Sequence, residues 1–93
     1  MGFIYVIYED DKPVYVGLTT KSVEERWSEH CDTAKRGYGG YLIHSKMHSH
    51  GLSHFSIYKI EDTDNLNERE KFWIKKLNTH VSLGGYNLTW GGE

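Results

Sequence analysis

The stretch FIYVIYEDDKPVYVG, residues 3 to 17, decides the fold of this chain. Two runs rich in Ile, Val and Tyr flank a polar cluster at residues 9–13, and this pattern predicts a β-hairpin. Strand side chains alternate between two faces, and neither face of the first run is polar. We therefore expect the hairpin to be covered on both sides, as a central pair of strands would be. Tyr5 and Tyr15 fall on opposite arms of this hairpin and should share one neighbourhood.

Length and composition describe a single domain spanning residues 1–93. The chain of 93 residues is too short to divide into halves that each bury a core. No apolar run approaches the ~20 residues of a membrane span, and the start MGFIYVIYED does not resemble a signal peptide. The lone Cys31 excludes an intrachain disulfide, which suits the cytoplasmic location that we expect. A net charge of −2 provides no general attraction to nucleic acid.

A helix is predicted directly after the hairpin. Ser22 and Glu25 form a capping box at its start, and Gly37 suits its C-terminal cap. The residues that recur at helical spacing should form its buried stripe, namely Val23, Trp27, Cys31 and Ala34.

The remaining elements complete the expected fold class. After a loop at Gly39-Gly40, residues 41–50 predict a short helix, with Leu42, Ile43 and Met47 facing inward. Residues 54–60 predict a third strand, and a last helix begins near residue 64 or 65 and runs to about residue 77. The order strand, strand, helix, helix, strand, helix predicts an α/β fold with a small, mainly antiparallel three-stranded sheet flanked by helices.

Glu70 interrupts the apolar pattern of the last helix. The apolar stripe of that helix consists of Leu66, Trp73, Ile74 and Leu77, and Glu70 lies within it. An ionised carboxylate that faces a core is costly unless it is paired or bound to a cation. Two interpretations remain open from the residues alone: a structural ion pair at the rim of the stripe, or a metal ligand or general acid/base in a cleft.

Arg26 and His30 lie four residues apart and should share one face of the first helix. A guanidinium beside an imidazole does not make a stabilising pair, but both groups suit an anion such as phosphate. Spacing alone favours the simpler interpretation, that both are solvated helix residues.

The other histidines raise the question of a zinc site. His44, His48 and His50 cluster, and Cys31 follows His30. A single Cys and the lack of a CxxC or HExxH pattern argue against structural zinc. We therefore expect His44 and His48 to be polar residues on the surface of a short helix.

Taken together, the residues resemble the GIY-YIG nuclease family. The first triplet appears as Phe3-Ile4-Tyr5 and the second as Tyr15-Val16-Gly17, nine residues apart. An arginine follows in EERWSEH, a glutamate in EREKFWIKKLNT and an asparagine in GYN, in the family's order. The resemblance covers nearly the whole chain and is greatest to the nuclease halves of phage-type intron homing endonucleases. It implies the GIY-YIG nuclease fold and a DNA endonuclease activity.

The resemblance implies a role for each residue of the first two elements. Tyr5 corresponds to the general base beside the attacking water, and Tyr15 to a second active-site phenol. Arg26 would hold the scissile phosphate. His30 matches a histidine of some members and is expected to hydrogen-bond Tyr5. Gly17 would allow close packing beside the phenols.

The C-terminal half would complete the site. By resemblance, Glu70 would bind a single divalent cation, Mg²⁺ or Mn²⁺, and Asn87 would brace the site from the tail. A free phenol has a pKa of ~10, so Tyr5 would need a positive neighbour or a hydrogen bond to act as a base near pH 7. The implied reaction is phosphodiester hydrolysis that leaves a 5′-phosphate and a 3′-hydroxyl, one strand at a time.

The sequence departs from the family in two respects. Phe3 stands where the first glycine usually lies, which should alter packing more than chemistry. Homing endonucleases of this type continue into a DNA-binding region, whereas this sequence stops at Glu93. We therefore expect the partner to be double-stranded DNA, the chain to be a monomer or a weak homodimer, and the DNA-binding region to be missing or separate. A basic edge for DNA would consist of Lys21, Lys35, Arg36 and Lys46.

Two alternatives remain beside the nuclease. One is a catalytically silent nucleic-acid-binding module of the same fold. The other is an isolated nuclease domain of a longer homing endonuclease, which would cleave feebly and with low sequence specificity.

Overall fold

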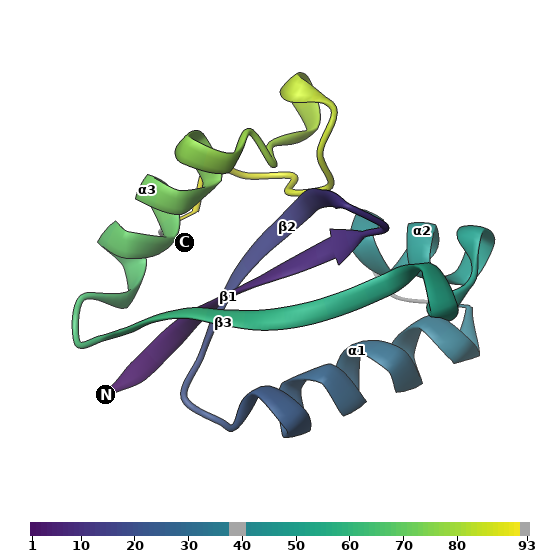
Figure 1. Ribbon diagram of the computed structural model, residues 1–93, viewed down its shortest axis with the longest axis horizontal. Coiled ribbons are helices and arrows are strands. Elements are labelled where there is room, and N and C mark those ends of the chain that lie inside the picture. The colour runs from purple at the N-terminus through teal and green to yellow at the C-terminus, as the bar shows by residue number, and fades with distance from the viewer. Residues whose placement is uncertain (38–40, 92–93) are drawn as a thin grey trace.

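A computed structural model describes residues 1–37 and 41–91 of the chain (Figure 1). The expected loop at Gly39-Gly40 lies outside the described residues. Within those two ranges, none of the helices is long and apolar enough to cross a membrane.

The sheet has three antiparallel strands: β1 (Gly2–Glu9), β2 (Lys12–Thr19) and β3 (Phe55–Thr63). The strand order is β2-β1-β3. The antiparallel three-stranded sheet is therefore confirmed, but the hairpin is not a central pair, because β2 forms an edge. The strand β3 also extends to Thr63, beyond the expected residue 60, since its last residues pair with Gly2–Ile4 at the start of β1.

Three helices follow the sequence prediction closely: α1 (Val23–Arg36), α2 (Leu42–His50) and α3 (Leu66–Leu77). The capping box at the start of α1 is present, because the Glu25 backbone N–H donates to Ser22 Oγ at 3.1 Å. The helix ends at Gly37, whose φ of 75° favours a residue without a Cβ. Short 3₁₀ turns occupy Leu52–His54 and Val81–Leu83.

Two apolar clusters cover the two faces of the sheet. Tyr5 and Ile7 of β1 pack with Ala34 of α1 and with α2, whereas Ile4 and Val6 pack against α3. Figure 1 shows the sheet lying between α1 and α2 on one side and α3 on the other. The expectation that both faces of the hairpin are covered is thus confirmed.

The buried face of α1 differs from the expected stripe. Ala34 is buried as expected, but the second fully buried residue of this helix is His30, with no exposed surface. Val23, Trp27 and Cys31 are only partly buried. The helix thus brings a polar side chain, His30, to the core beside its apolar stripe, since Trp27 and Cys31 still pack against the cluster that contains Tyr5 and Ile7.

His44 on α2 is likewise buried, with 7% of its surface exposed. The expectation that it decorates the helix surface is wrong, because its ring lies against His30 and Tyr41. His48, one turn further on, is exposed as expected.

Candidate active site

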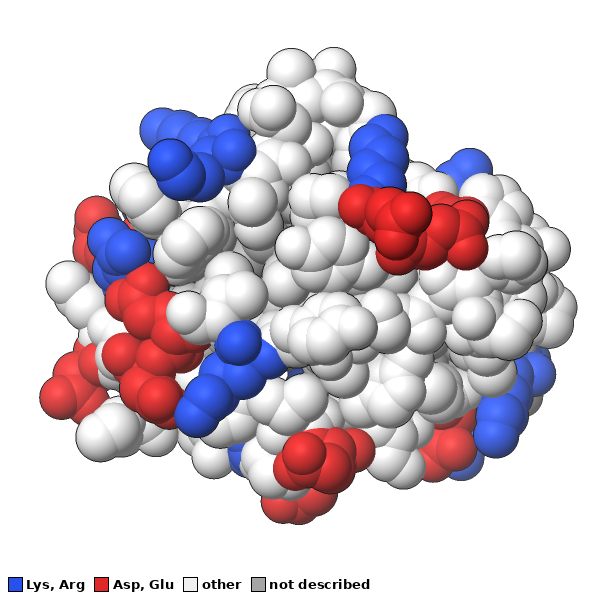
Figure 2. Space-filling view, in the orientation of Figure 1, with Lys and Arg blue, Asp and Glu red and all other residues white. Residues whose placement is uncertain are grey.

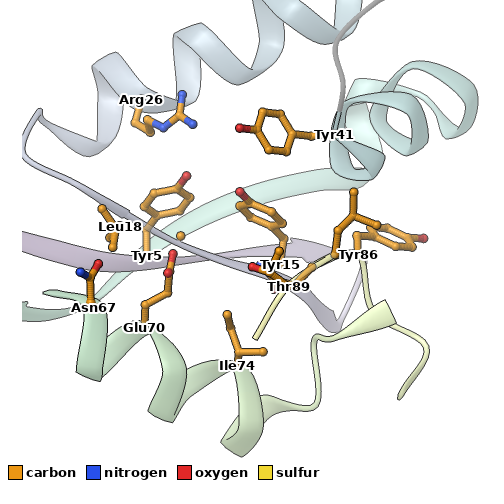
Figure 3. A pocket seen from close by; sticks show the side chains of 13 residues that line it. Tyr5, Tyr15, Leu18, Arg26, Tyr41, Asn67, Glu70, Ile74, Tyr86 and Thr89 are labelled. Atoms are coloured by element: carbon orange, nitrogen blue, oxygen red, sulfur yellow. The ribbon is translucent and has the colours of Figure 1, made fainter. Parts of the chain in front are cut away.

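A cleft of about 400 Å³ opens at the edge of the sheet beside β2. Four parts of the chain line it: the hairpin with α1, Tyr41 at the start of α2, the helix α3, and the tail after residue 85. Figure 3 shows Arg26 on the α1 side, Glu70 on the α3 side, and the two hairpin phenols between them. The predicted residues at the cleft are Tyr5, Tyr15, Gly17, Arg26, Glu70 and Asn87.

The hairpin places both phenols on the side of the sheet that α1 covers. The ring centroids of Tyr5 and Tyr15 are 6.4 Å apart, so the expected neighbourhood exists. Gly17 lies opposite Tyr5 in the register. A Cβ on Gly17 would come within 2.3 Å of Tyr5 Oη, so only glycine leaves room for this phenol.

Arg26 projects from the first turns of α1 into the cleft. It lies near enough to Tyr5 to lower the pKa of that phenol, and it donates from Nη1 to Glu29 Oε1 at 3.0 Å. Glu29 also accepts from Lys21. Half-burial alone would lower the pKa of Arg26, but the neighbouring Tyr5 and Glu29 raise it, so its positive charge is secured.

Behind Tyr5 lies a chain of two buried imidazoles. Tyr5 Oη lies 2.8 Å from His30 Nε2, which confirms the expected contact. On the far side of that ring, His30 Nδ1 lies 2.8 Å from His44 Nε2. His44 Nδ1 is buried and has no hydrogen-bond partner within residues 1–37 and 41–91. His30 therefore sits behind the cleft wall rather than in it.

The electrostatics favour neutral rings and neutral phenols in this region. Burial raises the pKa of Tyr5, and Tyr15 adds to the effect, while Arg26 acts against it. Burial raises the pKa of Tyr15 to about 12. Burial, with the nearby charge of Arg26, lowers the pKa of His30 to about 3 and lowers that of His44.

Glu70 reaches the cleft from the second turn of α3, as its interruption of the apolar stripe suggested. Its side chain is partly buried and points toward the phenols in Figure 3. Ile74, one turn later, is buried beneath it. In the tail, Gly91 approaches this carboxylate so closely that a Cβ there would lie 3.0 Å from Glu70 Oε1.

Asn87 fastens the tail to the free edge of β2. Its Oδ1 accepts from the Val16 backbone N–H at 2.9 Å, and its Nδ2 donates to the Val16 carbonyl at 2.9 Å. Thr79 Oγ1 donates to the same Oδ1 at 2.7 Å. The side chain is 6% exposed, so it holds the tail against the strand that carries Tyr15 and Gly17.

The four residues of the expected basic edge do not line the cleft. They are Lys21, Lys35, Arg36 and Lys46. Lys21 pairs with Glu29 near Arg26, whereas Lys35 and Arg36 are exposed in the last turn of α1. Lys46 Nζ lies 5.7 Å from the ring centroid of Tyr86.

Sequence reasoning missed several residues of the site. Tyr41 is 60% exposed and extends from the start of α2 across the cleft (Figure 3). Asn67 and Tyr86 also line the cleft. Tyr41 follows a glycine-rich segment, and nothing in the sequence around it indicated a functional side chain. The only sign of His44 was its helical spacing from Met47 and Tyr41.

Comparison with known proteins accounts for this arrangement. Residues 1–87 match the GIY-YIG catalytic domain. The fold superimposes on the catalytic domain of the homing endonuclease I-TevI with a TM-score of 0.79 and 30% identity, covering 96% of this chain and 99% of that one.

Among curated proteins, the intron-associated endonuclease 1 of Enterobacteria phage T4 is 34% identical over 80 residues, or 81% of this chain and 31% of that protein. The uncharacterized protein 019R of Invertebrate iridescent virus 6 is 30% identical over 93 residues, or 94% of this chain and 33% of that protein. The chain thus spans about a third of the length of these relatives. By its sequence, its fold and the residues gathered at its cleft, this chain belongs to the GIY-YIG family of nuclease domains.

Proposed function

We propose that this domain is a divalent-metal-dependent DNA endonuclease that hydrolyses phosphodiester bonds and leaves a 5′-phosphate and a 3′-hydroxyl. The observation that carries the proposal is the cleft itself, in which a guanidinium and a carboxylate face each other across two phenols. Unaided phosphodiester hydrolysis is extremely slow, so charge neutralisation and an activated water are both required. The cleft has groups for each task.

Arg26 and Tyr5 take the central roles. Arg26 binds the scissile phosphate, because a guanidinium forms paired hydrogen bonds to phosphate oxygens and keeps its charge. Tyr5 accepts the proton of the attacking water, and Tyr15 orients the water or the phosphate beside it. The pair is suited to this work because both phenols reach the same cleft as Arg26.

The carboxylate of Glu70 fits one hard cation. Mg²⁺ is typically held by one or two carboxylates and by substrate phosphates, and keeps several waters. Among the described residues, no group of three or more His, Cys, Asp or Glu is arranged to hold a metal, which suits a single carboxylate ligand that shares the ion with the phosphate. When bound, Mg²⁺ or Mn²⁺ would neutralise charge that develops on the phosphate oxygens. One such ligand favours one ion, and one strand cut at a time.

DNA affinity should come largely from outside residues 1–93. The net charge of −2 argues against tight binding by this domain alone. The chain also spans only about a third of its curated relatives. We therefore expect low sequence specificity from the isolated domain.

The test is plasmid nicking at low salt with Mg²⁺, Mn²⁺ or chelator. Glu70→Gln should reduce metal-dependent nicking at least 100-fold while the fold is retained, because it removes the ion's carboxylate ligand. Glu68→Gln, an equal charge change in the exposed first turn of α3, should nick like the wild type. Equal nicking by Glu70→Gln and wild type would contradict the site, and a folded wild type that never nicks, also when tethered to DNA, would favour the silent binding module.

A further inference from the structure

The buried imidazole of His44 lies behind His30, which separates it from the candidate general base Tyr5, and nothing in the nuclease roles above uses it. It is one of few buried polar side chains, and its Nε2 lies 2.8 Å from His30 Nδ1. Its own Nδ1 has no partner among the described residues. A buried ring nitrogen without a partner costs free energy, on the order of 1–3 kcal/mol, so its placement calls for an explanation.

We propose that His44 is a positioning residue, which accepts a hydrogen bond from His30 Nδ1–H and thereby keeps His30 Nε2 free to receive the proton of Tyr5. The three groups form a line of 2.8 Å contacts from Tyr5 Oη through both rings to His44 Nε2. The logic is that of a nucleophile, a base and an orienting third group, built here on a phenol. The inference rests on the proposed nuclease function, because it assigns Tyr5 the task of receiving a proton from water.

The protonation states follow from the surroundings of the phenol. Burial keeps Tyr5 protonated, and Arg26, which also contacts its oxygen, can only donate hydrogen bonds. The departing proton therefore needs a lone pair, and His30 Nε2 is at the right distance. A neutral His30 with a free Nε2 carries its proton on Nδ1. That N–H then requires an acceptor, and His44 Nε2 is in place to be one.

The step balances without any added reactant. As the water oxygen forms its bond to phosphorus, the water proton moves to Tyr5 Oη, and the Tyr5 proton moves to His30 Nε2. The bond from phosphorus to the 3′ oxygen breaks, and that oxygen takes a proton from solvent. His30 holds this proton only transiently and loses it to solvent after the cut, because burial and the charge of Arg26 disfavour a charged ring. Tyr5 thus acts as a base without ever becoming a free phenolate, which its burial disfavours.

The groups that face this chain of rings come from each packed element. Arg26 of α1 lowers the pKa of both imidazoles. Tyr15 of β2 lies edge-on to His30, with ring centroids 5.8 Å apart. Tyr41 lies edge-on to His44 at 5.9 Å. Glu29 of α1 acts against Arg26 at His30. The positive charge that acts on both rings is therefore the one proposed to hold the phosphate.

Two substitutions at position 44 separate hydrogen bonding from packing. His44→Gln keeps an acceptor for His30 Nδ1–H, whereas His44→Leu fills the space without one. We expect His44→Leu to slow single-turnover cleavage about 10- to 100-fold with DNA affinity within about twofold. His44→Gln should stay within about threefold of the wild type. Ser45→Leu, at the next and exposed position of the same helix, is the matched control and should cleave at the wild-type rate. Equal rates for wild type and a folded His44→Leu would overturn the proposal.

A second measurement does not depend on nuclease activity. Nitrogen-15 NMR of the histidine rings should report the Nδ1–H form of His30 in the wild type and in His44→Gln, and a shift toward the Nε2–H form in His44→Leu. A wild-type His30 with its proton on Nε2 would refute the assignment, also in a protein that cleaves. If the wild type does not cleave at all, the nuclease proposal fails, while the ring tautomers still decide the role of His44.

Discussion

At the scale of single residues, Arg26, the group proposed to bind the phosphate, is already paired with a carboxylate. Arg26 Nη1 donates to Glu29 at 3.0 Å, and Glu29 also takes Lys21. A DNA phosphate must therefore compete with Glu29 for the same guanidinium. The competition is mild, because Glu29 is 40% exposed and exposed ion pairs are worth little.

Glu29→Gln should accordingly tighten DNA binding by about two- to fivefold at low salt, because it frees Arg26 from a charged rival. Fluorescence anisotropy with a short duplex measures the change. Glu25→Gln, the same charge change one turn earlier on α1, controls for general repulsion of DNA, since Glu25 contacts Ser22 rather than Arg26. Equal gains in the two variants would show that Glu29 acts through net charge alone.

The sequence indicates the residues of the cleft unevenly. The shared neighbourhood of Tyr5 and Tyr15 follows from hairpin pairing, and Glu70 stands out because it breaks an apolar stripe, whereas Gly17 came only from the family resemblance. His44 could not be found this way, because its partner His30 lies on another helix and its burial depends on how α1 and α2 pack. A local sequence pattern identifies a side chain that does not fit its own helix, as Glu70 does not fit the apolar stripe of α3. It does not identify a side chain such as His44, whose partner lies on a different helix.

At the scale of elements, the edge strand β2 depends on the tail for its second partner. The Asn87 side chain presents both an acceptor and a donor to Val16, as a neighbouring strand would. Tyr86 N–H adds a bond of 2.7 Å to the Val14 carbonyl. The tail thus closes an edge that would otherwise expose unpaired backbone groups.

Asn87→Asp should lower the free energy of unfolding by about 1–3 kcal/mol, because it removes the donor to Val16 O and buries a carboxylate next to that carbonyl. Urea unfolding measures the loss. Asn67→Asp makes the same chemical change at an exposed position of α3, and should stay within about 0.5 kcal/mol of the wild type. If both variants lose the same stability, the tail does not brace β2.

Element order was readable from the sequence, whereas packing was not. Both ends of α1 were predicted correctly, its start from the cap at Ser22 and its end from Gly37, because helix capping depends on local sequence. His30, rather than Trp27, is fully buried on α1, where it contacts Tyr5 of β1 and His44 of α2. The end of β3 was missed for the same reason, since polar Glu61 is held there by Arg69 and Trp73 of α3.

At the scale of the whole molecule, two neutral buried histidines should make the domain sensitive to acid. The pKa of His30 is lowered to about 3, and that of His44 is lowered as well. An unfolded histidine, with a pKa of ~6.5, binds a proton below that pH while the folded one does not. The stabilising contribution of each neutral ring is therefore fully present above about pH 6.5. As the pH is lowered below that value, the free energy of unfolding decreases by up to ~1.4 kcal/mol per pH unit for each ring.

Urea unfolding of His44→Gln and wild type at several pH values between 7.5 and 5 isolates one ring. The variant should gain stability relative to the wild type as the pH falls, because it has no imidazole to protonate on unfolding. Ser45→Ala, at an exposed position of α2 that carries no titrating group, should differ from the wild type in free energy of unfolding by the same amount at every pH. If the difference in free energy of unfolding between His44→Gln and the wild type does not change with pH, His44 has the same pKa in the folded and unfolded protein.

Charge decides how such a domain finds DNA. In Figure 2 basic and acidic groups are interspersed over the surface in view, without a continuous basic band, and the net charge is −2. Few phosphates can then be neutralised at once, so binding by this domain should be weak. Gly91 lies against Glu70, so a partner joined after the tail would leave the domain beside the cleft.

A DNA-binding domain fused after residue 93 through a flexible linker should therefore raise cleavage near its own site by about 10²- to 10⁴-fold, because tethering supplies a high effective concentration. The comparison is an equimolar mixture of the two domains as separate chains. Both samples are used at a concentration well below the dissociation constant of the nuclease domain for DNA. The same fusion carrying Glu70→Gln shows that cutting comes from this cleft. Equal cleavage by fusion and mixture would mean that the domain binds DNA well by itself, against the expectation from its charge.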